Sequence, residues 1–190
     1  MDKGGFDGQT VRDKPGLKKR VLEWAGYLLV MGLFLYFFAP ESWWQFGVSP
    51  AAERKTGEAF VLKPLAGGPE WNFDEKRGKV VVVNYWATWC GPCRIETPGL
   101  VSFAEEHREK GVEVVGVTLD EDLALVGPFI ESYRITYPIL LPGADPNLPP
   151  GDMALPTTFL YDKQGRLAKK YTGMVLESTL RSDTAKLLAE

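Results

Sequence analysis

The chain has 190 residues, 45% of them hydrophobic and 12% aromatic, which suits one domain with a substantial core and further segments attached. The net charge of −3 does not favour nucleic-acid binding, because residues 1–20 carry +3 and the body of the chain is mildly acidic. With two cysteines and one histidine, the sequence excludes a disulfide framework and disfavours a dedicated zinc site.

An apolar stretch at residues 21–39 follows the basic cluster Lys18-Lys19-Arg20 and contains one charged residue, Glu23. As a helix it is about 28 Å long, close to the roughly 30 Å hydrocarbon thickness of a bilayer. The basic cluster predicts a cytoplasmic N-terminus, with the rest of the chain outside the cytoplasm. A cleaved signal peptide is one alternative, with an unusually long apolar region. A buried core helix is another, although the stretch has no polar face.

We therefore expect four parts: a polar cytoplasmic tail (1–20), a single transmembrane helix in the cytoplasmic membrane (21–39), a juxtamembrane linker (40–57) and a periplasmic or otherwise extracytoplasmic domain (58–190). Within that domain, we predict a short first strand at residues 59–62. The run Val80–Trp86 is β-branched and does not alternate, which is typical of a strand buried on both faces of a parallel sheet.

The remaining pattern alternates helices and strands. We predict, in order, a helix from about 93 to 110, a strand at 112–119, a helix from 120 to about 133–135, a strand at 137–141, a proline-rich loop at 142–150, a hairpin of strands 157–161 and 167–171, and a final helix at 176–188. This order predicts an α/β fold, a three-layer α/β/α sandwich. We expect Asp120-Glu121-Asp122 to cap a helix and His107 to lie on the surface.

Both cysteines belong to the motif Trp89-Cys90-Gly91-Pro92-Cys93, between the buried strand and a helix. A Cys-x-x-Cys pair in that setting indicates a dithiol/disulfide centre. A bridge across so short a loop adds little stability, so the pair's value lies in its reactivity. At a helix N-terminus the pKa of the Cys90 thiol should be lowered, which favours Cys90 as the attacking thiolate. Cys93, one turn further on, should be more buried and resolve the mixed disulfide.

The string NYWATWCGPC, residues 84–93, resembles the active-site segment of thioredoxins, and VVVNYWATWCGPCRIETP resembles the TlpA/ResA-like membrane-anchored branch of that superfamily. The resemblance covers residues 58–190. It implies a thioredoxin-like fold with a helix-strand insertion at about 120–141. Gly91-Pro92 matches thioredoxin itself, which leans toward a reductant. Leu155-Pro156 resembles the superfamily's cis-proline loop, which lies beside the dithiol; an ordinary trans proline is the alternative.

Two further positions decide which residue is expected to move the proton of Cys93. Asn84 stands where thioredoxin has a buried aspartate, so that acid–base route is absent. Glu96, three residues after Cys93, matches a glutamate of the family, and we expect it to tune the thiol pKa values and shuttle the resolving proton. The alternative is a solvated helix residue.

The resemblance implies a thiol–disulfide oxidoreductase that needs no cofactor beyond the Cys90/Cys93 pair and no metal. Its expected clients are proteins with cysteine pairs, such as apocytochrome c or copper-site proteins, and its expected electron donor is a membrane thiol transporter of the DsbD/CcdA kind. Trp89, Gly91, Pro92, Leu155 and Pro156 form the expected substrate-binding set. Two alternatives remain: a disulfide oxidase or isomerase of higher potential, and a non-enzymatic copper-binding assembly factor.

Overall fold

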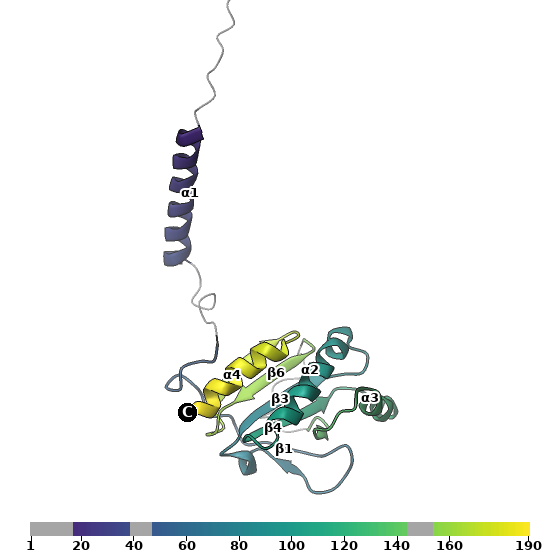
Figure 1. Ribbon diagram of the computed structural model, residues 1–190. Helices are drawn as coiled ribbons and strands as arrows, with labels where there is room; N and C mark the ends of the chain where they lie inside the picture. Colours follow the sequence, from purple (N-terminus) through teal and green to yellow (C-terminus); the bar gives the residue numbers. More distant parts are fainter. Residues whose placement is uncertain (1–16, 39–46, 144–153) are drawn as a thin grey trace, which may run out of the picture. The chain divides into compact units, whose positions relative to one another are not determined.

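The computed structural model describes residues 17–38, 47–143 and 154–190, which belong to an N-terminal unit ending at Phe46 and a compact unit, Gly47–Glu190 (Figure 1). In the first unit, helix α1 spans Leu17–Phe38, and its described side chains, residues 20–34, are all exposed. No helix within the described ranges is both long enough and apolar enough to cross a membrane. Most of the predicted tail and the first part of the predicted linker lie outside the described residues.

The compact unit is built on a five-stranded sheet with the order β5-β4-β3-β6-β7. The strands are β3 (Val80–Trp86), β4 (Val112–Thr118), β5 (Ile139–Leu140), β6 (Thr157–Tyr161) and β7 (Leu167–Thr172). Strands β3, β4 and β5 are parallel, whereas β6 and β7 form the predicted antiparallel hairpin. All seven residues of β3 are buried, as its non-alternating apolar sequence predicted.

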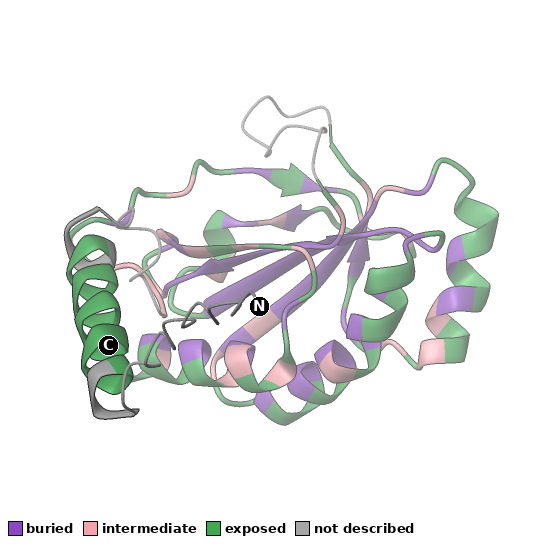
Figure 2. Cartoon of the chain, turned by 90° about the horizontal axis from the view of Figure 1, so that it is seen from above, coloured by how far each residue is buried: buried purple, intermediate pink, exposed green. Residues whose placement is uncertain are grey.

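The two faces of the sheet are covered differently, and this corrects the predicted α/β/α layering. Helices α2 (Gly91–His107), α3 (Val126–Tyr133) and α4 (Glu177–Ala189) contribute to one apolar cluster, on one side of the sheet (Figure 2). The opposite cluster is covered by the short antiparallel pair β1 (Val61–Leu62) and β2 (Trp71–Asn72). The described residues place no α-helix there.

The reason lies in the order of the crossovers. From β3 through α2 to β4, and from β4 through α3 to β5, the chain moves in the same direction across the sheet. Right-handed crossovers that move in one direction place their helices on the same face. The helix and strand at residues 126–140 occupy the predicted insertion. The return to β6 passes through residues 141–156, of which 144–153 lie outside the described range.

Several local predictions also need correction. No helix or strand was predicted between residues 63 and 79, yet this segment contains β2 and the 3₁₀-helix η2 (Asp74–Lys76). The helix predicted from residue 120 begins instead with the 3₁₀-turn η3 (Leu123–Leu125). His107 is buried rather than at the surface: its Nδ1 lies 2.9 Å from the Phe103 carbonyl oxygen, and its ring stacks on that of Phe103.

Residues 47–57, predicted as linker, belong to the compact unit. Arg54 is buried, and its guanidinium donates to Asp162 at 3.0 Å and to both carboxylate oxygens of Glu190 at 2.6 and 2.7 Å. A buried guanidinium is stable only when its charge is paired, and both partners are distant in sequence. The compact unit therefore begins at Gly47 rather than at residue 58.

Candidate active site

The two cysteines form a disulfide at the start of α2, with an S–S distance of 2.04 Å. Cys90 is the N-cap of the helix, and its Sγ accepts a hydrogen bond from the Cys93 backbone N–H at 3.2 Å. Cys90 is 5% exposed and Cys93 is 1% exposed. The attacking sulfur predicted from the sequence thus lies at the N-terminus of the helix, where a backbone N–H group and the helix dipole favour a thiolate.

The surface next to the disulfide is aromatic and accessible. Trp89 is 68% exposed, although it directly precedes the buried Cys90. Gly91 has no neighbouring atom within 4 Å of the place where a Cβ would lie, and Pro92 occupies the first helical turn, where its missing N–H costs no hydrogen bond. An exposed tryptophan beside a reactive sulfur offers a large contact area to a protein partner.

The predicted cis-proline loop lies at the same end of the sheet. The Leu155–Pro156 peptide bond is cis, which confirms the expectation from the sequence. Thr157, the next residue, pairs with Tyr85 near the end of β3, from which the cysteine turn begins. The Pro156 carbonyl oxygen accepts from the Gly173 N–H at 2.8 Å, which ties this loop to the segment after β7.

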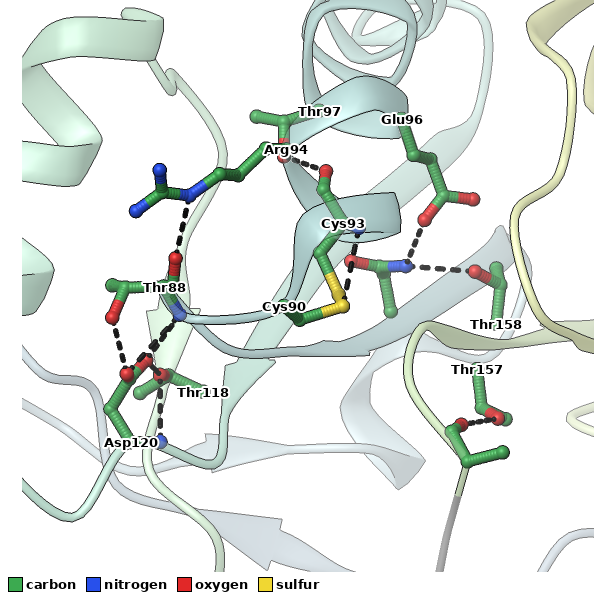
Figure 3. The surroundings of a disulfide bond; sticks show 12 residues. Thr88, Cys90, Cys93, Arg94, Glu96, Thr97, Thr118, Asp120, Thr157 and Thr158 are labelled. Carbon is green, nitrogen blue, oxygen red and sulfur yellow. Dashed lines mark hydrogen bonds between the residues drawn. A yellow bond between two sulfur atoms is a disulfide. The ribbon is translucent and has the colours of Figure 1, made fainter.

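On one side of the disulfide, Glu96 is connected to the cis-proline strand through Asn84 (Figure 3). The Asn84 amide donates to Glu96 Oε2 at 3.2 Å and to Thr158 Oγ1 at 2.8 Å, while the Val175 N–H donates to Glu96 Oε1 at 2.9 Å. Burial raises the pKa of the Glu96 carboxyl, and the two hydrogen bonds oppose that rise only in part. Glu96 is buried, not the solvated helix residue of the alternative interpretation.

On the other side lies a group that the sequence did not reveal as part of the site. The buried Asp120 carboxylate accepts from the Thr88 N–H at 2.9 and 3.1 Å, from the Thr88 hydroxyl at 2.6 Å and from the Thr118 hydroxyl at 2.7 Å (Figure 3). The Thr88 carbonyl oxygen in turn accepts from Arg94 Nε at 2.8 Å. Thr88 is therefore held from both sides, two residues before Cys90.

Asp120 was expected to cap a helix, and that expectation is wrong for this residue. Asp122 performs the capping, because its side chain accepts from the Ala124 N–H at the start of η3. The signal for Asp120 was its position directly after a buried parallel strand, since the carboxyl ends of such strands gather at the functional edge of a sheet. As to metals, the described residues contain no group of three or more His, Cys, Asp or Glu side chains that could hold one.

Comparison with known proteins places this geometry in a family. The family model described as Redoxin matches residues 55–188. The thiol-disulfide oxidoreductase ResA of Geobacillus thermodenitrificans is 36% identical over 127 residues, which is 66% of this chain and 72% of that protein. ResA of Bacillus cereus is 30% identical over 177 residues, 90% of this chain and 98% of that protein.

The chain belongs to the TlpA/ResA-like thioredoxin family. Among solved structures, a secreted thiol-disulfide isomerase from Corynebacterium glutamicum superimposes with a TM-score of 0.68 at 25% identity, covering 75% of this chain and 91% of that one. Like other TlpA/ResA-like proteins, this chain is a thiol–disulfide oxidoreductase with a thioredoxin-like α/β fold.

Proposed function

We propose that this oxidoreductase is a membrane-anchored reductase of disulfides in client proteins outside the cytoplasm. The reduced Cys90 thiolate attacks one sulfur of a client disulfide, which forms a mixed disulfide and releases one client thiolate. Cys93 then loses its proton and attacks Cys90 Sγ, which closes the Cys90–Cys93 disulfide and releases the second client thiolate. Two electrons pass to the client, and the two sulfurs released end as thiols after taking up two protons.

The observation that carries this proposal is the position of the disulfide. It lies at the N-terminus of α2, at the sheet end that also bears the cis Leu155–Pro156 bond and the exposed Trp89. A client segment could bind along the loop at Leu155 and Pro156 and pack against Trp89 while its disulfide meets Cys90. Gly91 and Pro92 between the cysteines match thioredoxin, which supports the reducing direction.

Glu96 is the proposed acceptor of the Cys93 proton. It lies on the same helix, three residues further on, and is buried. Because burial raises the pKa of its carboxyl, the group can exchange a proton nearer to neutral pH than an ordinary glutamate. Asn84 cannot take this role, since an amide does not titrate, but it orients Glu96.

The anchor is residues 21–39, and the electron donor is a membrane thiol transporter of the DsbD/CcdA kind. The exposure of α1 supports the anchor. More than half of the surface is exposed in several large apolar residues of this helix, among them Leu22, Leu28, Leu29 and Val30. Exposed apolar area of this extent is typical of a surface that binds a membrane or a protein partner. The proposed clients are apocytochrome c or copper-site proteins with cysteine pairs.

The anchor can be tested by fractionating cells that produce the full chain. We expect it to stay in the membrane pellet after alkaline washing, with the compact unit cleaved only by protease added outside the cytoplasmic membrane. A variant with Leu29→Arg and Leu33→Arg should lose the pellet association, because a charge at the centre of a span is costly. Wild-type protein in the soluble fraction would contradict the anchor.

Trapping tests the reductase function. Cys93→Ser leaves the Cys90 mixed disulfide unresolved, so covalent client complexes should accumulate in native membranes and disappear on treatment with a reductant. Cys90→Ser is the matched control, because it retains one thiol but removes the attacking sulfur. If Cys93→Ser traps no extracytoplasmic partner beyond those seen with Cys90→Ser, the proposal fails.

An isomerase is the second candidate, favoured by the likeness to the C. glutamicum isomerase. The reduction potential of the Cys90–Cys93 pair separates the two. A reductase should lie near the thioredoxin value of about −270 mV, whereas a value near −180 mV, typical of protein disulfide isomerase, would favour the isomerase.

A further inference from the structure

A groove lies between the active-site turn and the insertion helix α3. Its volume is about 460 Å³. One wall comes from Thr88 and Arg94, which lie on either side of the cysteine pair in sequence. The other wall comes from the insertion and consists of Leu125, Pro128, Phe129, Ser132 and Tyr133. The groove therefore joins the reactive turn to the segment that minimal thioredoxins lack.

Arg94 gives this groove a defined charge. Of its seven lining residues, it is the only one that carries a formal charge. Its Nε donates to the Thr88 carbonyl oxygen at 2.8 Å, which fixes the guanidinium beside the turn, and Figure 3 shows it on the side of the disulfide away from Glu96. Among the described residues its two terminal nitrogens have no hydrogen-bond or ion-pair partner. A held guanidinium with a free edge is suited to bind a carboxylate.

The rest of the lining suits a polypeptide segment. Leu125 is exposed, Phe129 and Tyr133 stack on each other with ring centroids 4.4 Å apart, and Ser132 adds a hydroxyl. Aromatic and apolar walls with one placed charge bind an apolar side chain that has an acidic neighbour.

We propose that this groove binds the client segment next to the cysteine under attack, and that Arg94 selects clients with an aspartate or glutamate there. The inference rests on the proposed function, because it names a recognition element of that same site. It also gives α3 a role in binding the client, because this helix contributes lining residues to the groove and none to the cysteine pair.

Binding is tested with peptides that cannot react. A client-like peptide with serine in place of both cysteines carries glutamate, glutamine or lysine two residues after the first serine, and its affinity for the oxidised full chain in detergent is measured. We expect the glutamate peptide to bind about two- to fivefold more tightly than the lysine peptide at low salt, as for an accessible ion pair. The difference should shrink at 0.5 M NaCl, where screening is stronger.

Variants at two arginines of α2 and its C-cap give the control. Arg94→Glu should make the lysine peptide bind more tightly than the glutamate peptide, and Arg94→Lys should keep the wild-type order. Arg108 is an exposed arginine at the far end of the helix, so Arg108→Glu should leave the preference for the glutamate peptide unchanged. Equal binding of all three peptides to wild type, or an unchanged preference in Arg94→Glu, would overturn the inference. Reduction of the disulfide form of the glutamate peptide is measured separately. If the protein prefers the glutamate peptide but does not reduce it, the groove proposal stands and the reductase proposal fails.

Discussion

Two buried carboxylates flank the disulfide, and their surroundings differ. Asp120 is 8% exposed and Glu96 is 6% exposed, so burial alone does not distinguish them. Both oxygens of Asp120 accept short hydrogen bonds from Thr88, and one also accepts from Thr118. Glu96 receives one donor on each oxygen, the longer of them 3.2 Å from the Asn84 amide, and its pKa is raised.

The difference separates a carboxylate that holds the active-site turn from the one that we propose to take part in proton transfer. On the Asp120 side, the hydrogen bonds from Thr88 join the segment that follows β4 to the turn that carries Cys90. On the Glu96 side, burial destabilises the charged form and raises the pKa of the carboxyl above that of an ordinary glutamate. The same residue chemistry thus holds the turn on one side and serves the proposed proton transfer on the other.

The largest effect should follow from removing the structural carboxylate. Asp120→Ala leaves the Thr88 N–H, the Thr88 hydroxyl and the Thr118 hydroxyl without their acceptor. Each unsatisfied buried donor costs about 1 kcal/mol or more, so the free energy of unfolding should fall by about 3 kcal/mol. Chemical denaturation of the full chain in detergent measures this. The neighbouring exposed Glu121→Ala is the control, and equal stability of the two variants would remove the structural role of Asp120.

Replacing Glu96 should instead change the rate of the proposed proton transfer. Glu96→Gln removes the proposed proton acceptor, so the step in which Cys93 resolves the mixed disulfide should slow by roughly tenfold to a hundredfold, at or below the low end of the range for positioned acid–base groups. The pKa of the Cys93 thiol should also fall, because a negative charge near it is lost. Rapid-quench kinetics and pH-dependent alkylation measure both.

The control is Glu105→Gln, an exposed carboxylate on the same helix. If Glu96→Gln leaves both the thiol pKa values and the resolving rate unchanged, Glu96 does not accept the Cys93 proton. Its role would then be structural, like that of Asp120.

The raised pKa of Glu96 also predicts how stability depends on pH. Below the ordinary glutamate value of 4.5, Glu96 is protonated whether the chain is folded or unfolded, and its contribution to stability is complete. As the pH rises toward the raised folded pKa, the unfolded chain loses its proton first, and stability falls by up to about 1.4 kcal/mol per pH unit. The measurement is the free energy of unfolding of wild type minus that of Glu96→Gln, from pH 4 to 8. A difference that does not change with pH would contradict the shift.

The sequence predicted one side of this comparison better than the other. The apolar run Val80–Trp86, the Cys-x-x-Cys spacing and the hairpin turn are local signals, and each gave the correct element. Glu96 was singled out as a candidate because its spacing from Cys93 matched a family pattern. Asp120 was missed because an aspartate after a strand and before a helix is also a usual helix cap. Its actual partner, Thr88, is 32 residues away, and that contact exists only once the sheet has formed.

The layers that cover the sheet also depend on contacts between distant residues, which the sequence alone did not predict. Strands β1 and β2 have two residues each, too short to show a periodic pattern, yet they cover the face where a helix layer was expected. The burial of His107 and of Arg54 likewise depends on neighbours brought together by the fold.

The smallest expected effect concerns the link between Glu96 and the cis-proline strand. Thr158→Val keeps the side-chain shape but removes the hydroxyl that accepts from the Asn84 amide at 2.8 Å. The loss of this bond should lower the free energy of unfolding by about 1 kcal/mol. The exposed Thr172→Val on β7 is the control. Since the amide still donates to Glu96, the fall of stability with pH attributed to Glu96 should persist in Thr158→Val. If that pH dependence disappears in Thr158→Val, the Glu96 side is as tightly interlocked as the Asp120 side, and the distinction between the two carboxylates does not hold.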